Sequence, residues 1–69
     1  MCLSTVYIED DHRTTEVMKN VAHMVSQNGG YLLIGLLGDE KFVRGKINSI
    51  DFISQHAVFL TAYAADAKT

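Results

Sequence analysis

Cys2 stands out chemically, because it is the only cysteine and occupies the second position. If Met1 is removed, the α-amine and thiolate of Cys2 form a five-membered chelate ring around a metal ion. If Met1 stays, the deprotonated amide nitrogen of Cys2 replaces the amine. Such N,S donors in a square-planar arrangement are typical of Ni(II) or Cu(II). One chain supplies two donors, so an N₂S₂ set requires two chains whose first strands meet at a two-fold axis. The alternative interpretation is a small apolar residue in the first strand, since unpaired cysteines mostly behave as buried hydrophobes.

The three histidines give no second metal motif, because they are far apart in the sequence: His12, His23 and His56. None pairs with another at the short spacing of a sequence-local metal site. His12 follows Asp10 and Asp11 and so belongs to an acidic turn that could bind a metal weakly, although solvated acidic turns are common. No serine or threonine has a histidine and carboxylate partner at a recognisable spacing. The pattern therefore predicts a binding protein rather than an enzyme.

The elements that must position Cys2 follow from an alternation of apolar and polar residues with period two, which is typical of strands. Alternating segments are separated by polar or glycine-containing turns. We expect strands at residues 3–8, 14–18, 19–27, 31–37, 41–50 and 56–61. Residues 19–27 also fit a helical spacing, but the following Asn28-Gly29-Gly30 favours a hairpin turn and hence a preceding strand. Gly45, inside an alternating segment, indicates a bulge or a sharp bend.

Five or six short strands joined by tight turns predict an all-β fold, a small and strongly bent antiparallel barrel of SH3-like or OB-like type. The nearly all-apolar residues 31–37 would form its central strand. Residues 1–61 are expected to form this one domain, and the small and polar residues 62–69 a flexible tail.

The length of 69 residues predicts self-association. Burial of apolar surface contributes ~100 kcal/mol at ~25 cal/mol/Å², and ordering a chain of this length costs ~100 kcal/mol. A chain with so small a margin usually needs a disulfide, a structural metal or a partner chain. One cysteine excludes an internal disulfide, and no cysteine–histidine pair has the spacing of a structural zinc site. We therefore expect a homodimer.

The charge balance and the hydropathy pattern argue against two classes of partner. Six lysines and arginines stand against eight aspartates and glutamates, for a net charge of −2, which argues against a nucleic-acid binder. No apolar run approaches the ~20 residues of a membrane span. The first residues show no basic segment followed by an apolar one, as a secretory signal would. We therefore expect a cytoplasmic protein with a reduced thiol.

The opening sequence MCLSTVY, residues 1–7, resembles the CooT family of small nickel-binding proteins, whose members begin Met-Cys-Leu and continue into a strand. Weaker similarities extend the resemblance over about residues 1–60, at 36–41, 45–47, 50–52 and 58–60. The resemblance implies an SH3-like β fold and a homodimer that holds one Ni(II) between its chains through Cys2. It also implies a metallochaperone or nickel store serving carbon monoxide dehydrogenase or another nickel enzyme.

Two segments depart from the family pattern, and two other classes compete with it. Gly35-Leu36-Leu37 stands where relatives have Asp-Leu-Phe, and Asn28-Gly29-Gly30 replaces a Glu-Gly-Asp-like turn, so docking to a client enzyme stays open. The first alternative is an RNA-binding small β-barrel, which the net charge opposes. The second is a hydrogenase maturation chaperone of the HypC/HupF type, which begins Met-Cys-Leu and uses that cysteine on iron. Such chaperones typically continue with a proline, and this chain has none.

Overall fold

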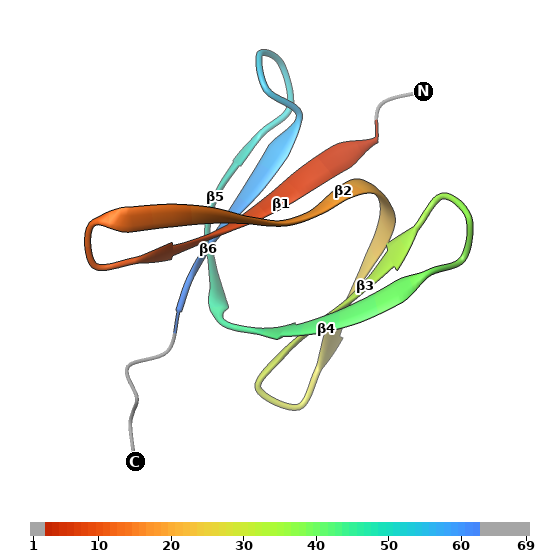
Figure 1. Ribbon diagram of the computed structural model, residues 1–69, viewed down its shortest axis with the longest axis horizontal. Helices are drawn as coiled ribbons and strands as arrows, with labels where there is room; N and C mark the ends of the chain where they lie inside the picture. Colours follow the sequence, from red (N-terminus) through yellow and green to blue (C-terminus); the bar gives the residue numbers. More distant parts are fainter. Residues whose placement is uncertain (1–2, 63–69) are drawn as a thin grey trace.

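The computed structural model describes residues 3–62, which form six strands (Figure 1). The strands are β1 (Ser4–Asp10), β2 (Arg13–Gln27), β3 (Gly30–Gly35), β4 (Glu40–Arg44), β5 (Lys46–Asp51) and β6 (Ala57–Thr61). The predicted all-β class is therefore confirmed over this range. Cys2 and, apart from Ala62, the expected tail lie outside the described residues. No helix in the described part of the chain is long and apolar enough to cross a membrane.

The six strands form one mixed sheet in the order β4-β3-β2-β1-β6-β5. Four neighbouring pairs are antiparallel, but β1 and β6 run parallel, with Thr5 opposite Ala57 and Glu9 opposite Thr61. The expectation of a purely antiparallel sheet is therefore wrong. The parallel pair arises because the last strand returns beside the first only after the chain has passed through the other four, not through a hairpin.

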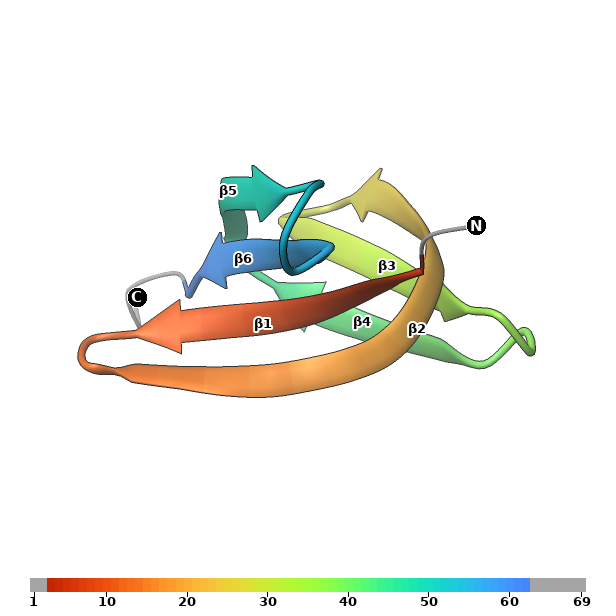
Figure 2. The ribbon, with the colours of Figure 1, turned by 90° about the horizontal axis from the view of Figure 1, so that it is seen from above.

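The sheet curls strongly but does not close, so the expected barrel is wrong as well (Figures 1 and 2). The two edge strands are β4 and β5, and within residues 3–62 no ladder joins them. Gly45 is the single residue between these strands. A strand needs a turn of at least two residues to fold back on its predecessor, so β5 continues from β4 around a corner and cannot pair with it. The predicted bend at Gly45 is confirmed.

β2 is one strand of 15 residues where the alternation predicted two short ones. Its pairing with β1 shifts register near Met18, and its pairing with β3 shifts between Val21 and His23. Between these irregularities Asn20 has a φ of 56°, in the left-handed region that asparagine tolerates better than most residues. Figure 2 shows the resulting arc, which carries the chain from one side of the sheet to the other. The extended interpretation of residues 19–27 was correct.

β3 is shorter and less central than the sequence predicts. It follows the expected hairpin turn, in which Gly29 has a φ of 74°. The strand ends at Gly35, so Leu36 and Leu37 belong to the next turn. β3 lies between β2 and edge strand β4, while β1 and β2 occupy the centre.

The core fills the inside of the curled sheet with aliphatic side chains. Its buried members are Val6, Val21, Leu33, Val43, Val58 and Leu60, with Ile8, Val17, Met18, Met24 and Tyr31 packed around them. On the other face of β1 and β6, the rings of Tyr7 and Phe59 stack with centroids 5.2 Å apart. This packing fixes β1, and therefore the point at which the chain enters the fold.

Candidate functional site

Cys2 precedes the described residues, so the site is defined by the place where the chain enters the fold at Leu3. β1 is held on both sides from its first residues onward. Ser4 lies opposite Val21 of β2, and Thr5 lies opposite Ala57 of β6. The amide of Thr5 also donates a hydrogen bond of 3.1 Å to the carbonyl of His56. The entry point is therefore a fixed position at one end of the sheet.

Two loops flank this entry point, and the strand register explains why. Val21 lies opposite both Ser4 and Gly35, so the turn that follows Gly35 lies at the same end of the sheet as the start of β1. Ala57 lies opposite both Thr5 and Asp51, which brings the β5–β6 loop to that end as well. Figure 1 shows the amino-terminal end of β1 between these two loops.

The two loops carry the most exposed large apolar side chains of the described residues. Leu36 and Leu37 in the β3–β4 turn are 55% and 93% exposed, and Phe52 and Ile53 in the β5–β6 loop are 76% and 87% exposed. We call these four residues the amino-terminal rim. Exposed apolar side chains gathered at one end of a small domain typically mark a surface that contacts a partner.

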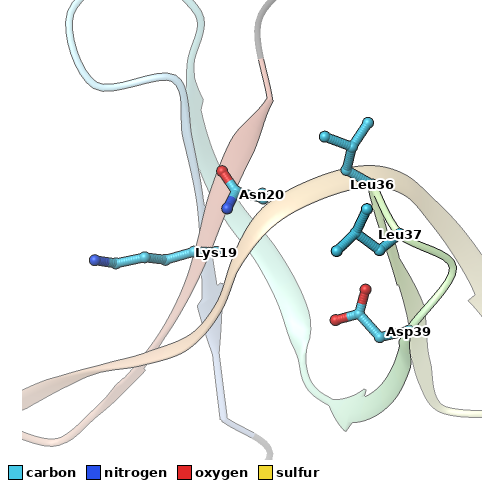
Figure 3. Close-up of a pocket in the computed structure, with 5 residues that line it drawn as sticks. All are labelled: Lys19, Asn20, Leu36, Leu37 and Asp39. Carbon is cyan, nitrogen blue, oxygen red and sulfur yellow. The ribbon is translucent and has the colours of Figure 1, made fainter.

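A hollow of about 200 Å³ lies beside the rim and is lined by Lys19, Asn20, Leu36, Leu37 and Asp39. The carbonyl of Asn20 accepts a 3.0 Å hydrogen bond from the amide of Leu36, which ties the β3–β4 turn to the bend of β2. Figure 3 shows the Lys19 side chain extending away from Leu37 and Asp39. The hollow combines an apolar wall with one carboxylate. Sequence reasoning could not identify Asn20, because its role depends on its backbone conformation.

The β5–β6 loop is held by Asp51. One oxygen of its carboxylate accepts hydrogen bonds of 2.9 Å from the backbone amides of both Ile53 and Ser54. The bond from Ser54 and then that from Ile53 are the main reasons why the pKa of Asp51 lies below its ordinary value of 3.8. These bonds fix the backbone at Phe52 and Ile53, and the two apolar side chains project outward from it.

The structure separates the three histidines. His56 adjoins the entry point through its carbonyl, is half-buried and has a φ of 50°. His12 lies in the turn after β1, where Asp10, Asp11, His12 and Arg13 line an open hollow of about 410 Å³. Seven residues of β1 separate the two ends of that strand by roughly 20 Å.

His23 is exposed on β2, two residues beyond Val21, which lies opposite Ser4. Among residues 3–62 no group of three or more histidine, cysteine, aspartate or glutamate side chains could hold a metal ion. His56 contacts the start of β1 directly, through the hydrogen bond that its carbonyl accepts from the amide of Thr5. This proximity of His56 to the start of β1 could not be predicted from sequence spacing, because 51 positions separate His56 from Thr5.

The fold and the opening sequence together define a small curled-sheet β protein whose second residue is its single cysteine. Residues 1–61 match the family of the CO dehydrogenase accessory protein CooT, and the chain belongs to this family. The crystal structure of a protein assigned as CooT from Carboxydothermus hydrogenoformans superposes with a TM-score of 0.80 at 20% identity, covering 88% of this chain and 97% of that one. No curated protein sequence matches the chain. The predicted resemblance is confirmed, and the structural likeness shows that the curled sheet is shared.

Proposed function

We propose that the chain binds nickel(II) through Cys2 and stores or delivers the ion for the maturation of CO dehydrogenase or another nickel enzyme. The observation that carries this proposal is membership of an accessory-protein family together with a single thiol in the second position. An accessory protein that carries a metal ion needs a ligand set that can be completed and then taken apart. It needs no acid–base pair of its own.

The donors are the thiolate and the neighbouring nitrogen of Cys2, supplied by each of two chains. Two N,S pairs make the four-donor set that suits square-planar Ni(II). Carboxylates and imidazoles of residues 3–62 do not cluster into a competing site, which favours a site completed by a second copy. Such a homodimer has a two-fold axis near the entry point of β1.

The amino-terminal rim supports this arrangement, because it flanks the entry point on two sides with apolar surface that a partner can cover. Contact between two rims would exclude water from the nickel ion and stabilise the dimer beyond the metal bonds themselves. Asp51 contributes by holding the loop that presents Phe52 and Ile53. Separation of the rims would expose the ion to a client enzyme, which is what delivery requires.

Release of the ion is coupled to protons in this mechanism. A thiol must lose its proton to bind nickel, so binding releases protons and weakens as the pH falls. A free cysteine thiol titrates near ~8.5, above cytoplasmic pH, and nickel therefore competes with a proton for the sulfur. Under these conditions a client enzyme can take the ion from the two cysteines if it offers more donors than they do.

Titration calorimetry with nickel tests the proposal on three proteins. We expect the wild-type chain to bind one nickel ion for every two chains, and Cys2→Ser to lose this binding, because a hydroxyl is a far poorer ligand than a thiolate. His56→Ala is the matched control for a ligand elsewhere at the same end of the sheet, and it should keep the stoichiometry. If Cys2→Ser binds nickel as the wild type does and His56→Ala does not, the site is centred on His56 and the proposal is wrong.

A further inference from the structure

The hollow beside the amino-terminal rim has the size of a site for one side chain of a partner protein. Its volume is about 200 Å³. Sites for small molecules and cofactors typically measure about 300–1,000 Å³, so this hollow is too small for such a ligand. A single long side chain that projects from another protein fits the space better.

Backbone hydrogen bonds hold the hollow in shape before a partner arrives. The amide of Leu36 donates a 3.0 Å hydrogen bond to the carbonyl of Asn20, and the amide of Gly35 donates one of 2.7 Å to the carbonyl of Asp39. Gly38, in the same turn, has a φ of 89° and donates a 3.0 Å hydrogen bond to the carbonyl of Gly35. A preformed site loses little conformational entropy when its ligand binds.

The carboxylate of Asp39 is the charged group that faces the hollow. It packs close to the backbone of Gly35, where any side chain in place of the glycine hydrogen would clash with it. Figure 3 shows this carboxylate directed toward Leu37, whereas the side chain of Lys19 extends in the opposite direction. The lysine that lines the hollow therefore does not neutralise the carboxylate, and the hollow favours a cation from outside the chain.

The lining of the hollow suits an aliphatic stem that ends in a cation. Leu36 and Leu37 offer exposed apolar surface, and Asp39 supplies a negative charge beside it. Arginine combines a stem that covers apolar surface with a planar cation that a carboxylate binds through two parallel hydrogen bonds. We propose that the hollow binds an arginine side chain of the client enzyme. This inference rests on the proposed function, because it names the chemistry by which a client docks.

The position of the hollow connects docking with delivery of the ion. Val21 lies opposite both Ser4 and Gly35, so the hollow is at the same end of the sheet as the entry point of β1. Leu36 and Leu37 also belong to the amino-terminal rim, which a second chain covers in the proposed nickel-bridged dimer. An arginine in the hollow competes with that second rim for the same leucines. Docking therefore favours the separation of the rims that exposes the nickel ion.

The hollow at the other end of β1 lacks these features. It is lined by Asp10, Asp11, His12 and Arg13. None of these side chains offers an aliphatic wall, and Arg13 places a cation beside the two carboxylates. An arginine from a partner would meet like charge there and no apolar surface. This second hollow therefore supplies a control for binding that depends on negative charge alone.

Nuclear magnetic resonance of the isotopically labelled chain, with a chelator present, tests the site without nickel. The probe is a blocked pentapeptide with one arginine between four glycines, and the comparison peptide carries citrulline, which has the same shape but no charge. We expect the arginine peptide to shift the amide signals of Asn20, Leu36 and Asp39, with a dissociation constant on the order of 1 mM, since one side chain makes few contacts. The citrulline peptide should bind about fivefold more weakly, as the loss of one exposed ion pair predicts.

Asp39→Asn should remove the preference for charge. In this variant the arginine and citrulline peptides should bind equally, because the cation has lost its partner. Glu40→Gln is the matched control, since Glu40 is the next carboxylate along the chain, is exposed and does not line the hollow. Asp11→Asn is the control at the other end of β1. Both controls should keep the fivefold preference for arginine.

Three results would overturn the proposal. The first is equal binding of the two peptides to the wild-type chain, or an undiminished preference for arginine in Asp39→Asn. The second is a set of peptide-induced shifts confined to residues 10–13, which would place the binding at the other hollow. The third is a shift of the Asn20 and Leu36 amides that grows with protein concentration in the absence of peptide, which would assign the hollow to a second copy of the chain.

A second titration separates this inference from the nickel site. With one nickel ion for every two chains, the wild type should bind the arginine peptide about fivefold or more weakly, because coupling between two ligands is reciprocal. Cys2→Ser should bind the peptide equally with and without nickel. An unchanged affinity in the nickel-bound wild type would contradict the competition with the second rim. A chain that binds nickel but not the peptide overturns the arginine site alone, and one that binds the peptide but not nickel overturns the nickel site alone.

Discussion

Ile53→Ser should break the proposed nickel-bridged contact while leaving the fold intact. The Ile53 side chain is 87% exposed in the single chain, and its backbone amide, which binds Asp51, is unchanged by the substitution. We therefore expect the free energy of unfolding to change by less than ~0.5 kcal/mol, as is usual for surface substitutions. If two rims meet across a two-fold axis, each contact covers two copies of Ile53. Full burial of an isoleucine contributes ~1.5–3 kcal/mol, so the loss should reach about 3 kcal/mol, or roughly a hundredfold in the dissociation constant.

The assay is sedimentation equilibrium with saturating nickel. Val25→Ser is the control. Val25 is also partly exposed, at 43%, but it lies near the carboxyl end of β2, away from the amino-terminal rim. Thermal unfolding of both variants checks that the fold is kept. Equal association of the Ile53→Ser and Val25→Ser variants would refute the placement of the contact at the amino-terminal rim.

Further substitutions test other parts of the structure. Leu33→Ala removes a fully buried side chain and should cost ~2–5 kcal/mol in urea unfolding; a cost below ~1 kcal/mol would contradict the core assignment. The pKa of Asp51 is lower in the folded chain, so its charge stabilises the fold above the ordinary value of 3.8, and this contribution is lost as the pH falls through the folded pKa. Asp51→Asn should therefore flatten the acid limb of stability against pH, and an unchanged limb would exclude this contribution. An extension before Met1 should abolish the planar nickel site if the α-amine is a donor, whereas one after Thr69 should not; equal spectra for the two extended proteins would exclude the α-amine and leave the amide nitrogen or another ligand as the donor. His12→Ala should leave nickel binding unchanged, and a loss would move the site to the far end of β1.

The strands and turns could be predicted because their signals are local. Alternation identified nearly every extended segment, and Asn28-Gly29 supplied the turn that resolved the ambiguous residues 19–27. The merging of two predicted strands into β2 depends on Asn20, whose left-handed backbone bends the strand without ending it. Asparagine adopts the left-handed conformation more readily than most residues, but the residue type alone does not predict that Asn20 adopts it.

The arrangement of the strands could not be predicted from local signals. The parallel pairing of β1 with β6 joins segments about 50 residues apart, and hydrophobic alternation looks the same in parallel and antiparallel neighbours. β4 and β5 do not pair with each other, because only Gly45 connects them. The sequence indicated a bend at Gly45 but not that the sheet stays open there. Long-range pairing is decided by how the whole core packs.

One part of the candidate site could be predicted from the sequence and the other could not. Cys2 was identified from its residue type and its position, which are properties of the sequence alone. The amino-terminal rim was not, because the two leucines of the β3–β4 turn were expected inside a strand and Phe52 and Ile53 were assigned to an ordinary turn. Only the register through Val21 and Ala57 brings these loops to the entry point of β1.

Absorbance spectroscopy during nickel titration tests the proposed function most directly. The protein carries its natural amino terminus, and Cys2→Ser is titrated in parallel. We expect a thiolate-to-nickel charge-transfer band that rises linearly and saturates at one nickel ion for every two chains, and no band in Cys2→Ser. Saturation without a charge-transfer band, or the same band in Cys2→Ser, would contradict a nickel site shared by two Cys2 residues.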